Sequence, residues 1–195
     1  MSVKQLIPVG SNNSNFTYEI VSKHNLNSIF SNLTSNENIT IDNLKTRMNN
    51  KDFMLQFKQI EKGIFANNLV LIDSFLPKII SHILLEFYLR DKKEVARILE
   101  TLDNENPLNF DQNEKYNFYS YKVGKLLLAI NRGMKPSQVW NGKSVINKAE
   151  TNFTNSNQYE KYLLKNTILD IANANQQKMV KVFQDNGHFY VALKF

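Results

Sequence analysis

Apolar side chains recur at steps of three and four residues between Tyr116 and Ile130, a period that lines one face of an α-helix. The members of this pattern are Tyr116, Tyr119, Val123, Leu127 and Ile130. Gly133 stands where a left-handed residue commonly ends a helix, and Pro136 prevents the helix from continuing. The pattern predicts a core helix that ends near Arg132.

A second face of the same helix is basic. Lys115, Lys122, Lys125 and Arg132 fall within a sector of about 100° when each residue advances by about 100°. Two interpretations follow from this stripe. Charged helix faces are commonly just solvated, whereas a cationic face can also contact the phosphates of a nucleic acid.

The chain before this helix mixes alternating and helical patterns. Alternation predicts strands, and the three-to-four-residue period predicts helices. Pro77 suits the first turn of a helix, where a missing N–H costs little. The predicted strands are 2–7, 16–21 and 53–60, and the predicted helices are 25–33, 42–49, 64–72, 74–89 and 92–102.

After Gly142 the pattern weakens and then becomes strand-like again. Residues 145–153 are weakly strand-like, 157–164 predict a short helix, and 179–183 and 189–193 predict strands. Asp185-Asn186-Gly187 predicts a tight hairpin turn, because Asn and Gly tolerate positive φ. The order predicts an α+β fold, with a helical middle flanked by short strands at both ends. We expect a single domain over 1–195, with a strand-rich part (1–60), a helical core (61–142) and a small α+β part (143–195).

Composition narrows the functional classes. A hydrophobic share of 42% supports a real core, and the net charge of +6 is compatible with a nucleic-acid partner. The absence of cysteine excludes disulfides, thiolate nucleophiles and Cys-based zinc sites. The apolar stretch 64–89 is interrupted by charged residues and Pro77, which favours a buried helical pair over a membrane span. We expect a soluble, cytoplasmic protein with no membrane partner.

Motifs for several common enzyme classes are missing. His24, His82 and His188 lie far apart, and no H-E-x-x-H pair is present. The chain also lacks the nucleophile elbow, the phosphate-binding P-loop and the dinucleotide-binding glycine motif. Acyl hydrolases, kinases, dinucleotide enzymes and zinc enzymes are therefore disfavoured.

Lys4 and the turn after it are candidate functional residues. A lysine in a short apolar strand costs desolvation unless it has a task or reaches out to solvent. The polar turn Ser11–Asn15 has hydroxyl and amide groups that can contact phosphates or base edges. The alternatives are an exposed lysine near a terminus and an ordinary loop.

Seven sequence blocks in a fixed order resemble the C-terminal half of the HpaII-type restriction endonuclease family. They are SVKQ, NFTYEI, FANNLVLIDSFLPKII, NPLNF, YKVGKLLLAINRGMKPSQVWNG, YLLKNT and GHFYVALKF. The fifth block is similar to a family hallmark in which a helix ends in G-M-x-P and is followed by W-x-G. The resemblance runs over nearly the whole chain.

This resemblance implies cleavage of double-stranded DNA at a short palindrome (CCGG in the namesake) with magnesium (Mg2+). Such enzymes resemble the PD-(D/E)xK nucleases, in which carboxylates hold the metal ion and a lysine assists the attacking water. The family's strand lysine corresponds to Lys4, the expected catalytic residue. The expected DNA contacts are Ser11, Asn12, Asn13, Asn15, Lys45, Arg47, Lys122 and Lys125.

The chain also departs from the family pattern. No acidic residue precedes Lys4, so no metal ligand is assigned and we expect little or no cleavage by this chain alone. Where the family has a Ser-rich stretch with Arg-His, this chain reads DIANANQQK. We therefore expect a truncated or degenerate copy, which acts as a homodimer or with a separate N-terminal half. The alternative is a non-catalytic remnant that binds DNA or another protein.

Overall fold

The computed structural model of the protein describes residues 5–9, 15–49, 52–61, 63–112, 117–171 and 177–195. The described strands are β1 (Gln5–Val9), β2 (Asn15–Ser22), β3 (Glu37–Thr40), β4 (Phe53–Ile60), β5 (Thr167–Ile171), β6 (Met179–Asp185) and β7 (His188–Lys194). The helices are α1 (Leu26–Ile29), α2 (Ile41–Met48), α3 (Gly63–Ile72), α4 (Leu76–Arg90), α5 (Val95–Glu105), α6 (Phe118–Asn131), α7 (Ser156–Asn166) and the 3-10 helix η1 (Glu150–Asn152). The α+β class predicted from the sequence is confirmed.

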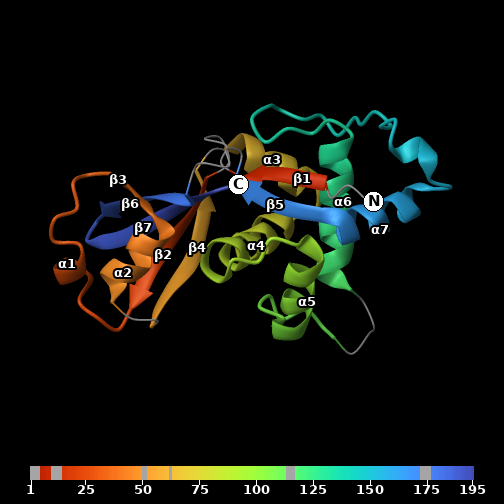
Figure 1. Ribbon diagram of the computed structural model, residues 1–195. Coiled ribbons are helices and arrows are strands. Elements are labelled where there is room, and N and C mark those ends of the chain that lie inside the picture. The colour runs from red at the N-terminus through yellow and green to blue at the C-terminus, as the bar shows by residue number, and fades with distance from the viewer. Residues whose placement is uncertain (1–4, 10–14, 50–51, 62, 113–116, 172–176) are drawn as a thin grey trace.

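One part of the molecule is an antiparallel sheet with the strand order β3-β6-β7-β2-β4 (Figure 1). Residues 15–18 of β2 are all buried, so both faces of the strand are covered there, and Ile20 further along is buried on the same face as Phe16 and Tyr18. The turn between β6 and β7 contains Asn186 and Gly187 with φ of 48° and 82°, which confirms the predicted hairpin.

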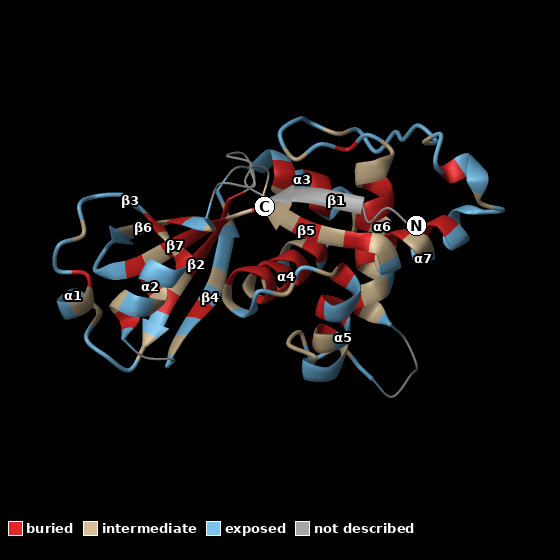
Figure 2. Ribbon diagram, in the orientation of Figure 1, coloured by how far each residue is buried: buried red, intermediate tan, exposed pale blue. Residues whose placement is uncertain are grey.

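The other part is helical, and α4 lies between it and the sheet (Figure 1). The Tyr18 hydroxyl of β2 donates to the carbonyl oxygen of Ser81 on α4 at 2.7 Å, and the Tyr88 hydroxyl of α4 donates to that of Lys194 at 2.9 Å. Buried residues gather on α4, on α6 and on the inner positions of the sheet (Figure 2). One continuous core therefore joins the two parts.

A second, two-stranded sheet pairs β1 with β5 in parallel. The opposite side of β5 contacts the start of α5, where Leu169 N donates to the carbonyl oxygen of Lys93 at 2.8 Å and Glu94 forms a bridge with Ile168. β5 therefore lies between β1 and the start of α5, and β1 is the edge strand of this sheet among the described strands.

Most predicted elements are present with small shifts in their ends. The strand expected at 2–7 is described from Gln5, and the helix expected at 92–102 occupies Val95–Glu105. The prediction of a weak strand at 145–153 is wrong, because this segment is a loop that leads into η1. β3 and β5 were not predicted.

The expected division into 1–60, 61–142 and 143–195 stays a prediction. Strands from the first and the last of these segments share the five-stranded sheet, since β2 pairs with β7 and β3 pairs with β6.

No single helix in the described ranges is long and apolar enough to cross a membrane. α3 and α4 reach the required length and composition only as a pair, and they are bent by 111° at the break between them.

Candidate nucleic-acid interface

The turn expected to face DNA lies mostly outside the described residues. Lys4, Ser11, Asn12 and Asn13 all lie outside the described residues, and Asn15, the last residue of the expected turn, is the first residue of β2. The Asn15 side chain is buried, and its Nδ2 donates to Glu61 Oε2 at 2.9 Å. Its Oδ1 is buried without a hydrogen bond to any described residue.

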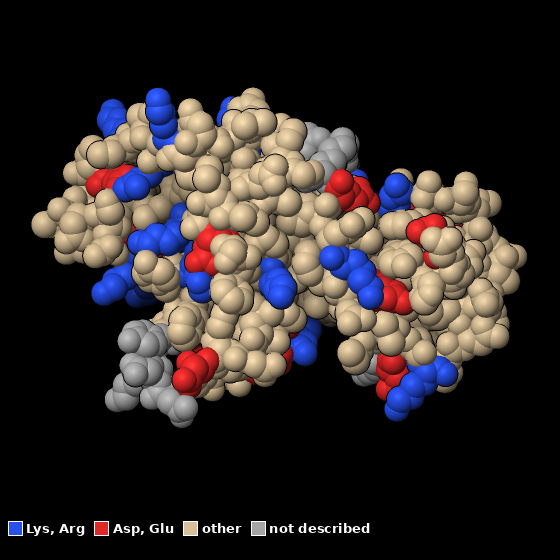
Figure 3. Space-filling model, turned by 180° about the vertical axis from the view of Figure 1, so that it is seen from behind, with Lys and Arg blue, Asp and Glu red and all other residues tan. Residues whose placement is uncertain are grey.

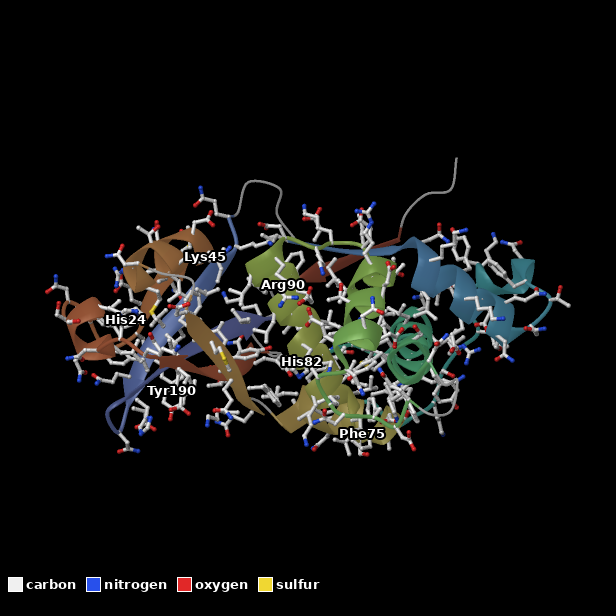
Figure 4. The ribbon with its side chains drawn as sticks, turned by 90° about the horizontal axis from the view of Figure 1, so that it is seen from below. His24, Lys45, Phe75, His82, Arg90 and Tyr190 are labelled. Atoms are coloured by element: carbon white, nitrogen blue, oxygen red, sulfur yellow. The ribbon has the colours of Figure 1, made fainter. Side chains whose placement is uncertain are left out.

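Lys45 and Arg47 lie on α2, next to the five-stranded sheet (Figure 4). Thr40 caps this helix, since its Oγ1 accepts from Asn43 N at 3.1 Å. Lys45 Nζ donates to the carbonyl oxygen of Leu89 at 3.1 Å. The Lys45 ammonium group is therefore hydrogen-bonded to the end of α4.

The Arg47 guanidinium forms a bidentate ion pair. Its Nη1 and Nη2 donate to the two carboxylate oxygens of Glu37 at 3.1 and 2.6 Å. Glu37 comes from β3, which the sequence pattern did not predict. About a third of the Arg47 side chain (33%) stays exposed, so some of its five N–H groups can still face solvent.

The basic stripe on α6, called the α6 stripe, has three described members, Lys122, Lys125 and Arg132. Each of them forms an ion pair with a carboxylate from another segment. Lys122 Nζ lies 2.5 Å from Asp73 Oδ2, and Lys125 Nζ lies 2.8 Å from Glu160 Oε2 on α7. Arg132 pairs with Glu150 of η1 through two hydrogen bonds. The stripe thus joins α6 to three neighbouring segments, while Lys115 lies outside the described residues.

These pairs differ in how far they are open to solvent. The Lys122 side chain is 13% exposed and that of Lys125 is 37% exposed. The Arg132 guanidinium holds the pKa of Glu150 below its usual range, and Ser156 Oγ donates a further hydrogen bond to the same carboxylate at 2.9 Å. Of these two described lysines, Lys125 is the more accessible.

Gly124 allows α7 to approach α6 closely. A Cβ at this position would lie 2.7 Å from Cδ and Cγ of Glu160, closer than real contacts allow. Glu160 is itself buried and bonded to Lys125. The absence of a side chain at Gly124 therefore leaves room for the Glu160 carboxylate that pairs with Lys125.

The sequence patterns did not reveal the residue that shapes the hallmark loop, the loop after α6 (133–149) that contains the G-M-x-P and W-x-G residues. Asn68 on α3 is 2% exposed, and its Nδ2 donates to the carbonyl oxygens of Lys135 and Gln138 at 3.1 and 2.8 Å. Its Oδ1 accepts from Trp140 N at 3.1 Å. The pair Asn67 and Asn68 on an otherwise apolar helix was the available signal, because a buried amide needs partners.

The described residues do not by themselves fit a divalent cation. No three His, Asp or Glu side chains within these ranges are close enough to hold a metal ion together. His24 and His82 lie in different parts of the molecule (Figure 4), and His188 Nδ1 lies 2.7 Å from Glu19 Oε1 on the sheet. Burial lowers the pKa of His82.

Comparison with known proteins gives two matches over most of the chain. The profile of the HpaII restriction endonuclease family matches residues 4–195. The chain is also 29% identical over 154 residues to the type II restriction enzyme HpaII of Haemophilus parainfluenzae, which covers 73% of this chain. This chain spans only 43% of that relative's length. No solved structure gives a significant match.

The family match covers almost every residue, including the Asn68 region and the loop that Asn68 holds. This chain belongs to the HpaII restriction endonuclease family.

Proposed function

We propose that the chain is part of a type II restriction endonuclease that cleaves double-stranded DNA at a short, CCGG-like palindrome. The observation that carries the proposal is the family match over residues 4–195. A relative with the printed name of a type II restriction enzyme supports it. The excess of 24 Lys and Arg over 18 Asp and Glu is consistent with a polyanionic partner.

The proposed catalytic group is Lys4, which immediately precedes β1. By family resemblance, the reaction uses Mg2+, and the described residues supply no ligand set for it. The proposal therefore assigns no metal ligand here. A fold of the PD-(D/E)xK nuclease type, and assembly either as a homodimer or with a separate N-terminal half, belong to the same proposal.

The proposed DNA contacts are of two kinds. Ser11, Asn12 and Asn13, which lie between β1 and β2 in the sequence, and Asn15 at the start of β2 would meet phosphates or base edges. Lys45, Arg47, Lys122 and Lys125 would meet phosphates through the N–H donors that their internal partners leave free.

A plasmid cleavage assay tests the nuclease proposal. The 195-residue chain is incubated with Mg2+ and a supercoiled plasmid that carries one CCGG site, and the Lys4→Ala variant is the matched control. Nicking or cutting at that site by the chain, lost in the variant, supports an endonuclease with Lys4 as its catalytic lysine and contradicts the expectation that this chain alone cleaves little or not at all. Equal cutting by both proteins contradicts the role of Lys4.

The second candidate is a non-catalytic DNA-binding or protein-interaction role. It is favoured by the described residues' lack of a three-ligand metal cluster. Salt-dependent duplex binding without any cleavage supports the DNA-binding form of this alternative. The absence of duplex binding at low salt contradicts both DNA roles and leaves protein interaction.

A further inference from the structure

Residues 133–149 form a loop that carries positive charge only. Its sequence, GMKPSQVWNGKSVINKA, contains Lys135, Lys143 and Lys148 and neither Asp nor Glu. All three lysines are exposed, and no ion pair with a described carboxylate forms at any of them. Lys and Arg side chains project along the upper edge of the helical part, where this loop runs (Figure 3). These cations differ from the α6 stripe, whose described members are paired internally.

The loop is held in shape at both ends and in its middle. Asn68 bonds three backbone groups between Lys135 and Trp140. Met134 is buried at the start, and Asn147 Nδ2 donates to the carbonyl oxygen of Asn131 at 3.2 Å near the end. A loop ordered before its ligand arrives loses less entropy on binding. The three lysines are thus carried on a preformed backbone.

Aliphatic side chains lie exposed between these lysines. Val139, Val145 and Ile146 are 83%, 79% and 65% exposed. Exposed apolar groups on a fixed surface commonly mark a contact site. Cations around aliphatic groups suit duplex DNA, where the cations meet phosphates and the aliphatic groups meet sugars or a groove. The purely positive charge favours a polyanion over a protein surface.

We infer that the 133–149 loop is a DNA-contacting element, in which Lys135, Lys143 and Lys148 bind backbone phosphates of the duplex. The inference rests on the proposed function, since it takes DNA as the ligand. It adds DNA-contacting residues that differ from Lys4 and from residues 11–15, and it gives the hallmark loop a task. Asn68 is then a positioning residue for this surface.

The test compares two triple variants with equal loss of charge. The loop variant carries Lys135→Gln, Lys143→Gln and Lys148→Gln. The control variant carries Lys23→Gln, Lys78→Gln and Arg97→Gln, three exposed positions outside the loop that form no ion pair with a described residue. Fluorescence anisotropy with a labelled CCGG duplex gives the affinity of the full chain from about 50 to about 200 mM salt. Thermal unfolding checks that both variants fold.

Three phosphate contacts contribute about 2.7 to the slope of log affinity against log salt. The wild-type affinity should therefore fall about 40-fold more over this fourfold salt range than that of the loop variant. The control variant should keep nearly the wild-type slope. Equal slopes for the two variants overturn the inference while leaving the proposed function intact.

Two further outcomes also contradict the loop assignment. If the wild-type chain does not bind the duplex at the lowest salt, the proposed function fails together with the inference. If Val139→Asp changes the oligomeric state while DNA binding is unaltered, the loop serves a protein contact instead. A salt slope that is reduced in the loop variant alone is the result that supports it.

Discussion

Asn68 Oδ1 accepts a hydrogen bond from the backbone N–H of Trp140 at 3.1 Å, across 72 residues of sequence. The same amide donates to the carbonyl oxygens of Lys135 and Gln138, and the former also accepts from Gln138 N at 3.3 Å within the loop. One side chain therefore helps to satisfy three backbone groups of the loop. The shape of the hallmark loop therefore depends on a residue of α3.

Removing this amide should destabilise the protein. Asn68→Ala leaves the carbonyl oxygen of Gln138 and the N–H of Trp140 without their partner and removes one of the two hydrogen bonds to the carbonyl oxygen of Lys135. We expect the free energy of unfolding to fall by about 2–4 kcal/mol, since water can reach part of the loop. Asn67→Ala, at an exposed position one residue earlier, should change it by less than about 0.5 kcal/mol. Urea unfolding of both variants measures the difference. Equal stabilities would show that the loop does not depend on Asn68.

Gly124→Ala should destabilise the contact between α6 and α7. The new Cβ meets the Glu160 side chain, which is buried and bonded to Lys125. We expect a loss of about 1–2 kcal/mol, since overpacking outweighs the better helix propensity of alanine.

The Glu160→Ala background provides the control for this change. Without the glutamate the clash is absent, and Gly124→Ala should become neutral or stabilising by up to about 1 kcal/mol. Urea unfolding of the four proteins of this cycle measures the coupling. Additive effects would mean that Glu160 is not what excludes a side chain at position 124.

Glu150 should make stability depend on pH under acidic conditions. Arg132 lowers the pKa of Glu150, so the folded state holds its proton less tightly than the unfolded state does. The stabilisation is present above the unfolded pKa of about 4.3 and is lost as the pH falls below it toward the folded pKa.

Glu150→Gln removes this dependence. We expect a loss of about 2 kcal/mol near neutral pH, less than for a fully buried pair because the Arg132 side chain is 20% exposed. The difference between wild type and variant should shrink as the pH is lowered from about 5 to about 3. Urea unfolding at a series of pH values measures it. A difference that stays constant over this range would contradict the role of this pair.

The two described lysines of the α6 stripe should differ as phosphate contacts. Lys125 is 37% exposed and Lys122 is 13% exposed, so Lys125 keeps more of its donors open to solvent. We expect Lys125→Gln to lower the salt slope of duplex binding by about 0.9 and Lys122→Gln to lower it less. Salt titrations of the two variants, run side by side, measure this order. The reverse order would contradict the ranking by exposure.

The sequence predicted the elements with strong patterns. The period of α6, the alternation of β2 and the Asn186-Gly187 turn are local features, and each is present. The short strands β3 and β5 were missed, because four or five residues carry little periodicity and their pairing partners lie far away in sequence. Residues 145–153 alternate weakly, yet side-chain and backbone hydrogen bonds to the end of α6 hold part of them as a loop.

The candidate site was less predictable than the fold. The basic stripe could be read from spacing, whereas Asp73, Glu150 and Glu160 reach it only through tertiary packing. The same holds for Asn68, whose partners lie about seventy residues ahead. Lys4, Ser11, Asn12 and Asn13 stay predictions, since they lie outside the described residues.

Duplex binding by the wild-type chain tests the central claim, that this chain acts on DNA, most directly. Anisotropy is measured with a CCGG duplex and with a duplex of the same composition that carries CGCG. We expect tighter binding to CCGG and a fall in affinity of about 10³-fold or more between about 50 and about 200 mM salt, if six or more phosphates are contacted. Absence of binding to either duplex at the lowest salt would contradict it.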